Sequence, residues 1–394
     1  MQEGNQKHAS TLGMYVHVPF CSSTCDFCAF YQERPSKKRI KSYFLSLKDE
    51  MLRYMQGSPF DTVFIGGGTP GLLKPEELDT LCILIKELGL KKGTEWTIEL
   101  APNEVSSEKL SVLKNAGVNR ISLGVQTFDA KLMDALGRKH GPDKIYKAYD
   151  LIQKTNFESV NLDLIFGIPG QSLAQWETDM MHAVDLKPNH LSTYCLTFEE
   201  DTALYAKLSA GEISIDPERE AEFYERAWSY LPHHGYKQYE ISNFALDGYS
   251  CLHNLNTWKM NEWIGFGPSA CSQYQNKRWK NPASLEKWES GVRAGFSSKD
   301  YDEFSELSEQ TLAEDAILFG LRMNQGIKIY EIGQRFGLSR KSLNNLSEFF
   351  KCLIKENLAI EIDGSVCLTT EGRIRADAIA AEVPPLASAR IVES

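Results

Sequence analysis

Short apolar runs rich in β-branched residues alternate with amphipathic stretches along the first half of the chain. The apolar runs predict strands at residues 15–18, 62–65, 96–100, 120–125, 159–165 and 190–196. The amphipathic stretches predict helices at 37–55, 75–88, 107–116, 130–136, 143–154 and 173–186. This alternation predicts an α/β fold with a parallel sheet, because right-handed crossovers return the chain to the same edge each time. The strands are apolar on both faces, as expected for parallel strands that are covered on each side.

Glycine and polar residues gather where the predicted strands end. These positions are a cysteine-containing loop after the first strand, a glycine-rich loop at 66–70, and the single residues Glu99, Gln126, Asp163 and Thr197. Functional residues at the C-terminal ends of several parallel strands are typical of a TIM-like barrel. The pattern therefore favours a barrel over a doubly wound sheet.

The pattern changes after residue 280. We predict helices at 303–325, 329–336 and 341–351, followed by a β-hairpin of residues 358–362 and 365–368 that turns at Asp363–Gly364. Helices followed by a two-stranded wing indicate a winged-helix-like domain. The predicted organisation is an N-terminal tail (1–13), a core barrel with an extension (14–280), a C-terminal domain (281–380) and a disordered tail (381–394).

Charge and composition limit the function classes. The net charge of −10 argues against a nucleic-acid partner, since phosphate binding requires a positive field. No apolar stretch approaches the ~20 residues that a transmembrane helix needs. Nine cysteines without a secretory leader indicate a reducing compartment, so we expect a cytoplasmic protein, with peripheral membrane contact left open.

Three cysteines stand close together after the first predicted strand. Cys21, Cys25 and Cys28 are spaced C-x3-C-x2-C, and the other six cysteines are scattered singly. Three thiolates on one loop are one ligand short of a closed tetrahedral zinc site or of a fully capped four-iron cluster. A zinc knuckle or three buried free thiols are the alternatives, but a structural zinc site would need a fourth ligand from a second pair. The spacing therefore favours an iron–sulfur site with an open position.

The cysteine spacing, with Phe27 before the last cysteine, resembles the signature of radical S-adenosylmethionine (SAM) proteins. The resemblance implies a [4Fe-4S] cluster held by the three cysteines, with its fourth iron chelating SAM. The loop Gly66-Gly67-Gly68-Thr69-Pro70 resembles the loop that holds the methionine amino group in that superfamily. On its own, the loop would be equally well explained as a tight turn. Six strand–helix units then imply a partial (β/α)6 barrel.

Further motifs are similar to the HemN/HemW family of radical SAM proteins. They are Tyr15-x-His17-x-Pro19-Phe20-Cys21, Gly124-Val125-Gln126, Gly137-Arg138 and the stretch from Asp163 to Gly170. That family also has a C-terminal domain of the predicted kind. Carried over by position, the resemblance implies SAM contacts at Tyr15, Phe27, Gly67, Gly68, Thr69, Glu99, Gln126, Arg138, Asp163 and Thr197. Taken singly, Glu99, Gln126, Arg138 and Asp163 are more typical of strand-end hydrogen bonding or of a solvated charge than of a ligand contact.

Three features resemble the heme-chaperone branch of that family. Phe30 stands where the coproporphyrinogen dehydrogenase branch has a fourth cysteine, and only 14 residues precede Tyr15. The third feature is a segment similar to the HNxxYW motif, in which Thr257 replaces the tyrosine: His253-Asn254-Leu255-Asn256-Thr257-Trp258. The implied partners are heme or porphyrin and acceptor hemoproteins, membrane-bound ones included, with a homodimer left open. The alternatives are a coproporphyrinogen III dehydrogenase and a related radical SAM methyltransferase.

His253 is the candidate heme ligand, because imidazole is the commonest axial ligand of heme iron. The alternative is a buried histidine that forms hydrogen bonds and packs near Trp258 and Trp263. Dense aromatic residues in this segment are equally typical of an ordinary core.

Overall fold

The computed structural model describes residues 11–55, 57–138 and 141–387. It contains all six predicted strand–helix units. The strands are β1 (Leu12–Val18), β2 (Phe60–Gly67), β3 (Leu90–Leu100), β4 (Arg120–Gln126), β5 (Ser159–Phe166) and β6 (His190–Cys195). The helices after them are α1 (Lys37–Leu52), α2 (Pro75–Glu87), α3 (Ser107–Ala116), α4 (Ala130–Ala135), α5 (Pro142–Thr155) and α6 (Leu173–Asp185).

The six strands form the parallel centre of one sheet, where they lie side by side in chain order. Beyond β6 come β8 (Asn243–Ala245) and β7 (Lys237–Gln238). Beyond β1 come β9 (Glu262–Phe266), β10 (Cys271–Tyr274), β11 (Lys277–Lys280) and β12 (Glu303–Glu306). β9 pairs with β1 in parallel, and the strands from β10 to β12 pair antiparallel. Among the described residues no pairing joins the two ends of this sheet, so the barrel is partial and open, as predicted.

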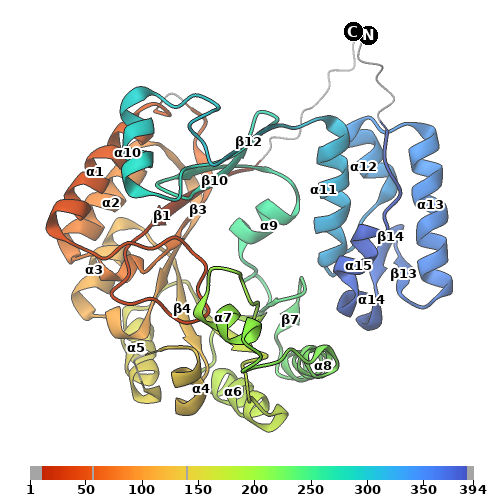
Figure 1. Cartoon of the computed structure of the whole chain (residues 1–394), viewed down its shortest axis with the longest axis horizontal. Coiled ribbons are helices and arrows are strands. Elements are labelled where there is room, and N and C mark those ends of the chain that lie inside the picture. Colours follow the sequence, from red (N-terminus) through yellow and green to blue (C-terminus); the bar gives the residue numbers. More distant parts are fainter. Residues whose placement is uncertain (1–10, 56, 139–140, 388–394) are drawn as a thin grey trace.

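The two faces of the sheet differ in chemistry. The outer face is apolar and is covered by the helices that connect the strands, whereas buried polar side chains such as Thr62, Asn161 and His190 line the inner face. The short helix α9 (Leu252–Trp258) contacts β1 and β2 on this inner side (Figure 1). A side chain at Gly13 of β1 would meet the Asn256 side chain of α9 at 3.1 Å, so α9 packs closely against this strand.

The C-terminal unit consists of helices and one hairpin (Figure 1). Its elements are α11 (Glu309–Arg322), α12 (Ile329–Phe336), α13 (Arg340–Lys355), β13 (Ala359–Ile362), β14 (Ser365–Leu368), α14 (Thr370–Ile374) and α15 (Ala376–Ala381). The remaining helices, α7 (Ala203–Ser209), α8 (Pro217–His233) and α10 (Leu285–Ala294), belong to the core. No helix among the described residues has the length and apolar character needed to cross a membrane.

Two predicted boundaries differ from the structure. The single helix expected at 303–325 is wrong: residues 303–306 form β12, where Phe304 pairs with Trp279 of β11, and the helix starts only at Glu309. Pairing with a neighbouring strand overrides a local helical pattern here. Because β12 belongs to the large sheet, the core extends past the expected boundary at residue 280 to about residue 306.

The ends of the chain also differ from expectation. β1 begins at Leu12, inside the predicted N-terminal tail, whereas residues 1–10 lie outside the described residues. Leu386 is buried, and the Ala387 amide donates to Ser342 Oγ at 2.8 Å, so the first part of the predicted disordered tail packs on α13. The rest of that tail, residues 388–394, lies outside the described residues.

Phe166, at the end of β5, packs between the sheet and the helices α6 and α8. It is fully buried, and its ring centroid lies 4.7 Å from that of Tyr224 and 5.2 Å from that of Trp176. We expect Phe166→Ala to lower the free energy of unfolding by about 3–5 kcal/mol, measured by urea denaturation. Leu45→Ala, at an exposed position of α1, is the control and should change it little. Equal effects of the two substitutions would contradict this packing.

Candidate functional site

The loop after β1 carries the three clustered cysteines. Cys21, Cys25 and Cys28 are partly exposed free thiols, and the Cys28 amide donates to the Cys25 carbonyl at 3.2 Å in a tight turn. The chain that leaves the loop pairs in parallel with its start: the Cys21 amide donates to the Glu33 carbonyl at 3.0 Å, and the Glu33 amide donates to the Pro19 carbonyl at 2.7 Å. Burial raises the pKa of the Cys21 and Cys28 thiols, and Arg138 acts in the opposite direction on both.

The glycine loop lies directly against the beginning of the cysteine loop. The amide of Gly68 donates to Val18 and that of Thr69 donates to Phe20, both at 2.8 Å. A side chain at Gly68 would come within 2.8 Å of the Phe20 carbonyl oxygen, so this crossing admits only glycine. It places Thr69 Oγ1 3.2 Å from Cys21 Sγ. The predicted cysteine and glycine sites are therefore one continuous structure.

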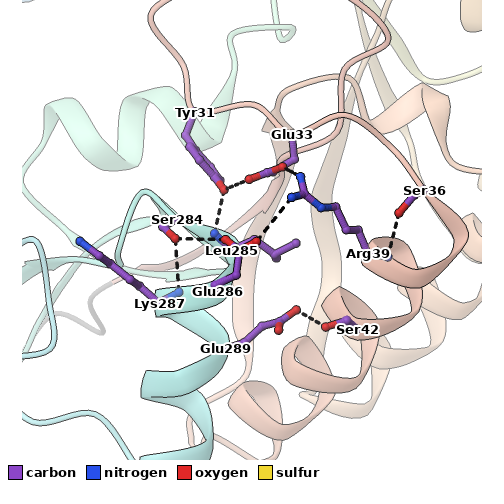
Figure 2. A network of polar contacts seen from close by, with 10 residues as sticks. All are labelled: Tyr31, Glu33, Ser36, Arg39, Ser42, Ser284, Leu285, Glu286, Lys287 and Glu289. Carbon is purple, nitrogen blue, oxygen red and sulfur yellow. Dashed lines mark hydrogen bonds and ion pairs between the residues drawn. The ribbon is translucent and has the colours of Figure 1, made fainter.

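A polar network holds the chain that leaves the cysteine loop (Figure 2). The Tyr31 hydroxyl donates to Glu33, and it accepts from the Leu285 amide at the start of α10 at 2.7 Å. Arg39 of α1 donates to Glu33 and contacts Glu286 of α10 at 3.5 Å. The loop is thus fixed to two helices that are far apart in sequence, an arrangement that no motif in the sequence indicated.

Two carboxyl groups, Glu99 and Asp163, lie near each other inside the sheet. Burial and the neighbouring Asp163 raise the pKa of Glu99 to about 8. A hydrogen bond from the Gly67 amide acts in the opposite direction on this pKa. Burial also raises the pKa of Asp163, although Ser122 and Asn161 each donate to it at 2.8 Å. Neighbouring carboxyl groups with raised pKa values favour a cation between them, because a positive charge would stabilise both ionised forms.

Gln126 and Arg138 converge on Gly124. A bulge between β4 and β5 gives Gln126 a left-handed backbone (φ 69°), and a side chain at Gly124 would lie 3.1 Å from Gln126 Nε2 and 3.8 Å from Arg138 Nη2. The Arg138 guanidinium lies 5.8 Å from the Phe27 ring centroid, and its buried Nε has no hydrogen-bond partner. A buried guanidinium with unsatisfied donors beside the cysteine loop suits a carboxylate ligand.

Tyr15 and His17 continue the site into the sheet. The Tyr15 hydroxyl lies 3.1 Å from His17 Nδ1, and its ring stacks on that of Phe64. His17 Nε2 contacts the Tyr31 carbonyl at 3.2 Å, and burial lowers the pKa of this imidazole to about 4. We did not predict a role for His17, although its motif was visible. It lies under Gly67 and supports the glycine loop.

Two predicted residues lie away from this group. Thr197 is exposed just beyond the end of β6. His253 lies in α9, where its Nδ1 is 2.9 Å from Thr62 Oγ1 and its ring is 5.2 Å from that of Phe64. Thr62 is near the start of β2, whereas the glycine loop follows the end of that strand. His253 is buried, so a heme would reach it only if α9 moved away from β2.

The residues near the cysteine loop suit a cluster with a bound amino acid sulfonium. They combine three free thiols on one loop, two carboxyl groups that favour a cation, and a cation that favours a carboxylate. Within the described residues, no three His, Cys, Asp or Glu side chains surround a point where one metal ion would bind.

Sequence comparison finds a matching family model for the core and another for the C-terminal unit. The model of the Radical SAM superfamily matches residues 15–183, and that of the HemN C-terminal domain matches residues 307–375. The chain is 34% identical to the heme chaperone HemW of Bacillus subtilis over 91% of this chain and 96% of that protein. It is 37% identical to the Escherichia coli heme chaperone HemW over 66% and 69% of the two chains.

Structural comparison supports the same fold. The solved structure of coproporphyrinogen III oxidase (HemN) from Escherichia coli matches with a TM-score of 0.81, covering 94% of this chain and 89% of that one, at 22% identity. At this identity the likeness establishes the fold alone. The match covers the core and the C-terminal unit together, so their arrangement is shared.

The raised pKa of Glu99 predicts a pH-dependent stability. The folded state holds this proton more tightly than the unfolded state, so the stabilisation is complete below pH 4.5 and is lost as the pH rises to about 8. In the unmodified protein the free energy of unfolding should therefore fall with rising pH across this window, and Glu99→Gln should reduce the slope of that fall by up to ~1.4 kcal/mol per pH unit. Urea denaturation at several pH values measures this. The exposed Glu108→Gln is the control, and parallel pH profiles for Glu99→Gln and the unmodified protein would contradict the prediction.

Proposed function

Because the chain belongs to the HemW family of radical SAM proteins, we propose that it is a heme chaperone, which binds heme and delivers it to acceptor hemoproteins, membrane-bound ones among them. The observation that carries this proposal is the extent of the similarity, which spans nearly the whole length of the Bacillus subtilis heme chaperone, C-terminal domain included. A radical SAM core alone would support only the superfamily.

Phe30 supports the chaperone over the coproporphyrinogen dehydrogenase. This side chain is 67% exposed two residues after Cys28, so the cysteine loop ends in an apolar surface residue, and no fourth thiol follows the three ligands there. An exposed phenylalanine has no core to stabilise, and it suits contact with an apolar ring or a partner protein.

The residues of the candidate site divide between two cofactors that the family implies. Cys21, Cys25 and Cys28 would hold a [4Fe-4S] cluster, and when bound it supplies an electron to SAM. Arg138 would bind the SAM carboxylate, whereas Glu99 and Asp163 would hold its cationic and hydroxyl groups. The tight contact between Gly68 and Phe20 would fix the distance between the two sets.

The experiment that tests the proposed function distinguishes heme transfer to an acceptor from chemical conversion of a porphyrinogen. Protein with a reconstituted, reduced cluster is incubated anaerobically with SAM and coproporphyrinogen III, and porphyrin masses are followed. We expect no loss of carboxyl groups, and we expect stoichiometric heme uptake with transfer to an apo-hemoprotein. Stepwise decarboxylation would establish a coproporphyrinogen dehydrogenase instead, and failure to take up heme would contradict the chaperone.

Removing one cluster ligand should separate the cluster from heme uptake. We expect Cys25→Ala to lose bound iron and sulfide, because a cluster held by two cysteines on a partly exposed loop is poorly protected, while heme still binds. Iron and sulfide analysis with heme titration measures both. Cys352→Ala, an exposed free cysteine on α13, is the matched control and should retain the cluster. A full cluster content in Cys25→Ala would remove Cys25 from the ligand set.

A further inference from the structure

A cavity of about 380 Å³ lies between the core and the C-terminal unit. The end of β6, helix α8 and the helices α11, α14 and α15 surround it. Its lining residues are Cys195, Leu196, Thr197, Phe198, Ile215, Glu220, Tyr224, Ile241, Arg322, Arg373, Ile374, Ala376 and Asp377. Because β6 ends at the same edge of the sheet as β1 and β2, the cavity adjoins the edge that carries the cysteine loop.

Only one layer of side chains separates this cavity from the cysteine loop. Leu196 and Phe198, which line the cavity, belong to the small hydrophobic cluster that also includes Phe27 of the cysteine loop. Thr197, which we predicted as a SAM contact, lies between them and lines the cavity as well. A ligand in the cavity would thus be close to the cluster site without sharing its residues.

Arg373 brings a buried positive charge to the cavity wall. Its guanidinium lies 4.8 Å from the Trp228 ring centroid and donates to Gln238 Oε1 at 2.6 Å, while its buried Nε has no partner. The guanidinium also donates to the Thr370 hydroxyl, which is a neutral acceptor like the Gln238 amide. Burial lowers the pKa of this guanidinium. Such a group favours an anionic ligand.

Arg322 is the second cation of the cavity. Its Nη1 lies 2.7 Å from the Asp377 carboxylate, but its Nε is buried without a partner. Asp377 itself is 90% exposed, so solvent weakens this ion pair. Glu220 is the other acid in the wall, and burial together with Asp216 raises its pKa. Among the described residues of the wall, an ion pair joins Arg322 to Asp377, and none joins Arg373 to either acid. Arg373 is therefore the arginine that an anionic ligand could pair with directly.

Apolar and aromatic side chains, among them Ile215, Ile241, Ile374 and Tyr224, line the cavity beside the arginines. Two arginines beside an apolar wall suit a flat apolar molecule with carboxylates at one edge. Resting on the proposed function, we infer that this cavity binds the propionate edge of heme, with Arg373 and Arg322 as the carboxylate partners. The cavity is at the small end of ligand pockets, so much of the ring stays outside. An exposed ring is what transfer to an acceptor requires.

The test compares variants of the full-length protein. Arg373→Gln and Arg322→Gln should each weaken heme binding about tenfold or more, measured by heme titration and by the rate of heme loss to an excess of an apo-hemoprotein. Arg373→Lys should retain part of the affinity because it keeps the charge. Arg226→Gln is the control: Arg226 lies on α8, a helix that borders the cavity, but it pairs with Glu177 and does not line the cavity. Circular dichroism and melting temperature show that each variant is folded.

A modified ligand tests the same contact in the unmodified protein. Heme dimethyl ester lacks both negative charges, so it should bind more weakly than heme, and Arg373→Gln should not weaken its binding further. Equal affinities of unmodified protein for the two ligands, or the same loss for both ligands in Arg373→Gln, would overturn the cavity assignment while leaving the chaperone intact. No heme uptake by unmodified protein would overturn the chaperone and, with it, this inference.

Discussion

The site depends on one close crossing of backbones, where the glycine loop passes the end of β1. Two amide hydrogen bonds of 2.8 Å, from Gly68 to Val18 and from Thr69 to Phe20, fix the two segments together. There is no room for a side chain at Gly68. Because the first cysteine follows Phe20 directly, the crossing fixes where the cysteine loop begins. The same loop gives Glu99 an amide donor from Gly67 and gives Cys21 a hydroxyl from Thr69. The residues that we propose as cluster ligands and as SAM contacts thus share one rigid reference point.

The second constraint is electrostatic, since the inner face of the sheet holds charges that the protein itself does not neutralise fully. On the acidic side, burial raises the pKa of both Glu99 and Asp163, and Asp163 raises that of Glu99 further; on the basic side, Arg138 keeps a buried donor without a partner. Unpaired buried charges are costly, so an apolar replacement would suit stability better. Their arrangement makes sense as the complement of a ligand with separated positive and negative ends. The cavity around Arg373 repeats this principle for a purely anionic ligand.

The sequence predicted the parts of this fold that local patterns encode. The six strand–helix units, the three clustered cysteines and the C-terminal hairpin all follow from periodicity and spacing, and the structure contains each of them. It did not predict β9, which pairs in parallel with β1 although almost 250 residues separate their starts, Leu12 and Glu262. Nor did it predict β12, whose residues read as helix until they pair with β11. The same limit applies to the site. The link from Tyr31 and Glu33 to α10 joins residues that no motif connects.

Helix α9 makes contacts at both of its ends that the sequence motif does not reveal. His253 suggests a metal ligand, yet its imidazole contacts Thr62, and its amide donates to Glu95 of β3 at 2.9 Å. At the other end of the helix, the ring of Trp258 packs against Phe319 and lies beneath the Arg322 guanidinium. The helix therefore connects the interior of the sheet to the helix that carries a cavity arginine. The His–Asn…Trp segment therefore joins the inner face of the sheet to the C-terminal unit through side-chain contacts at both of its ends.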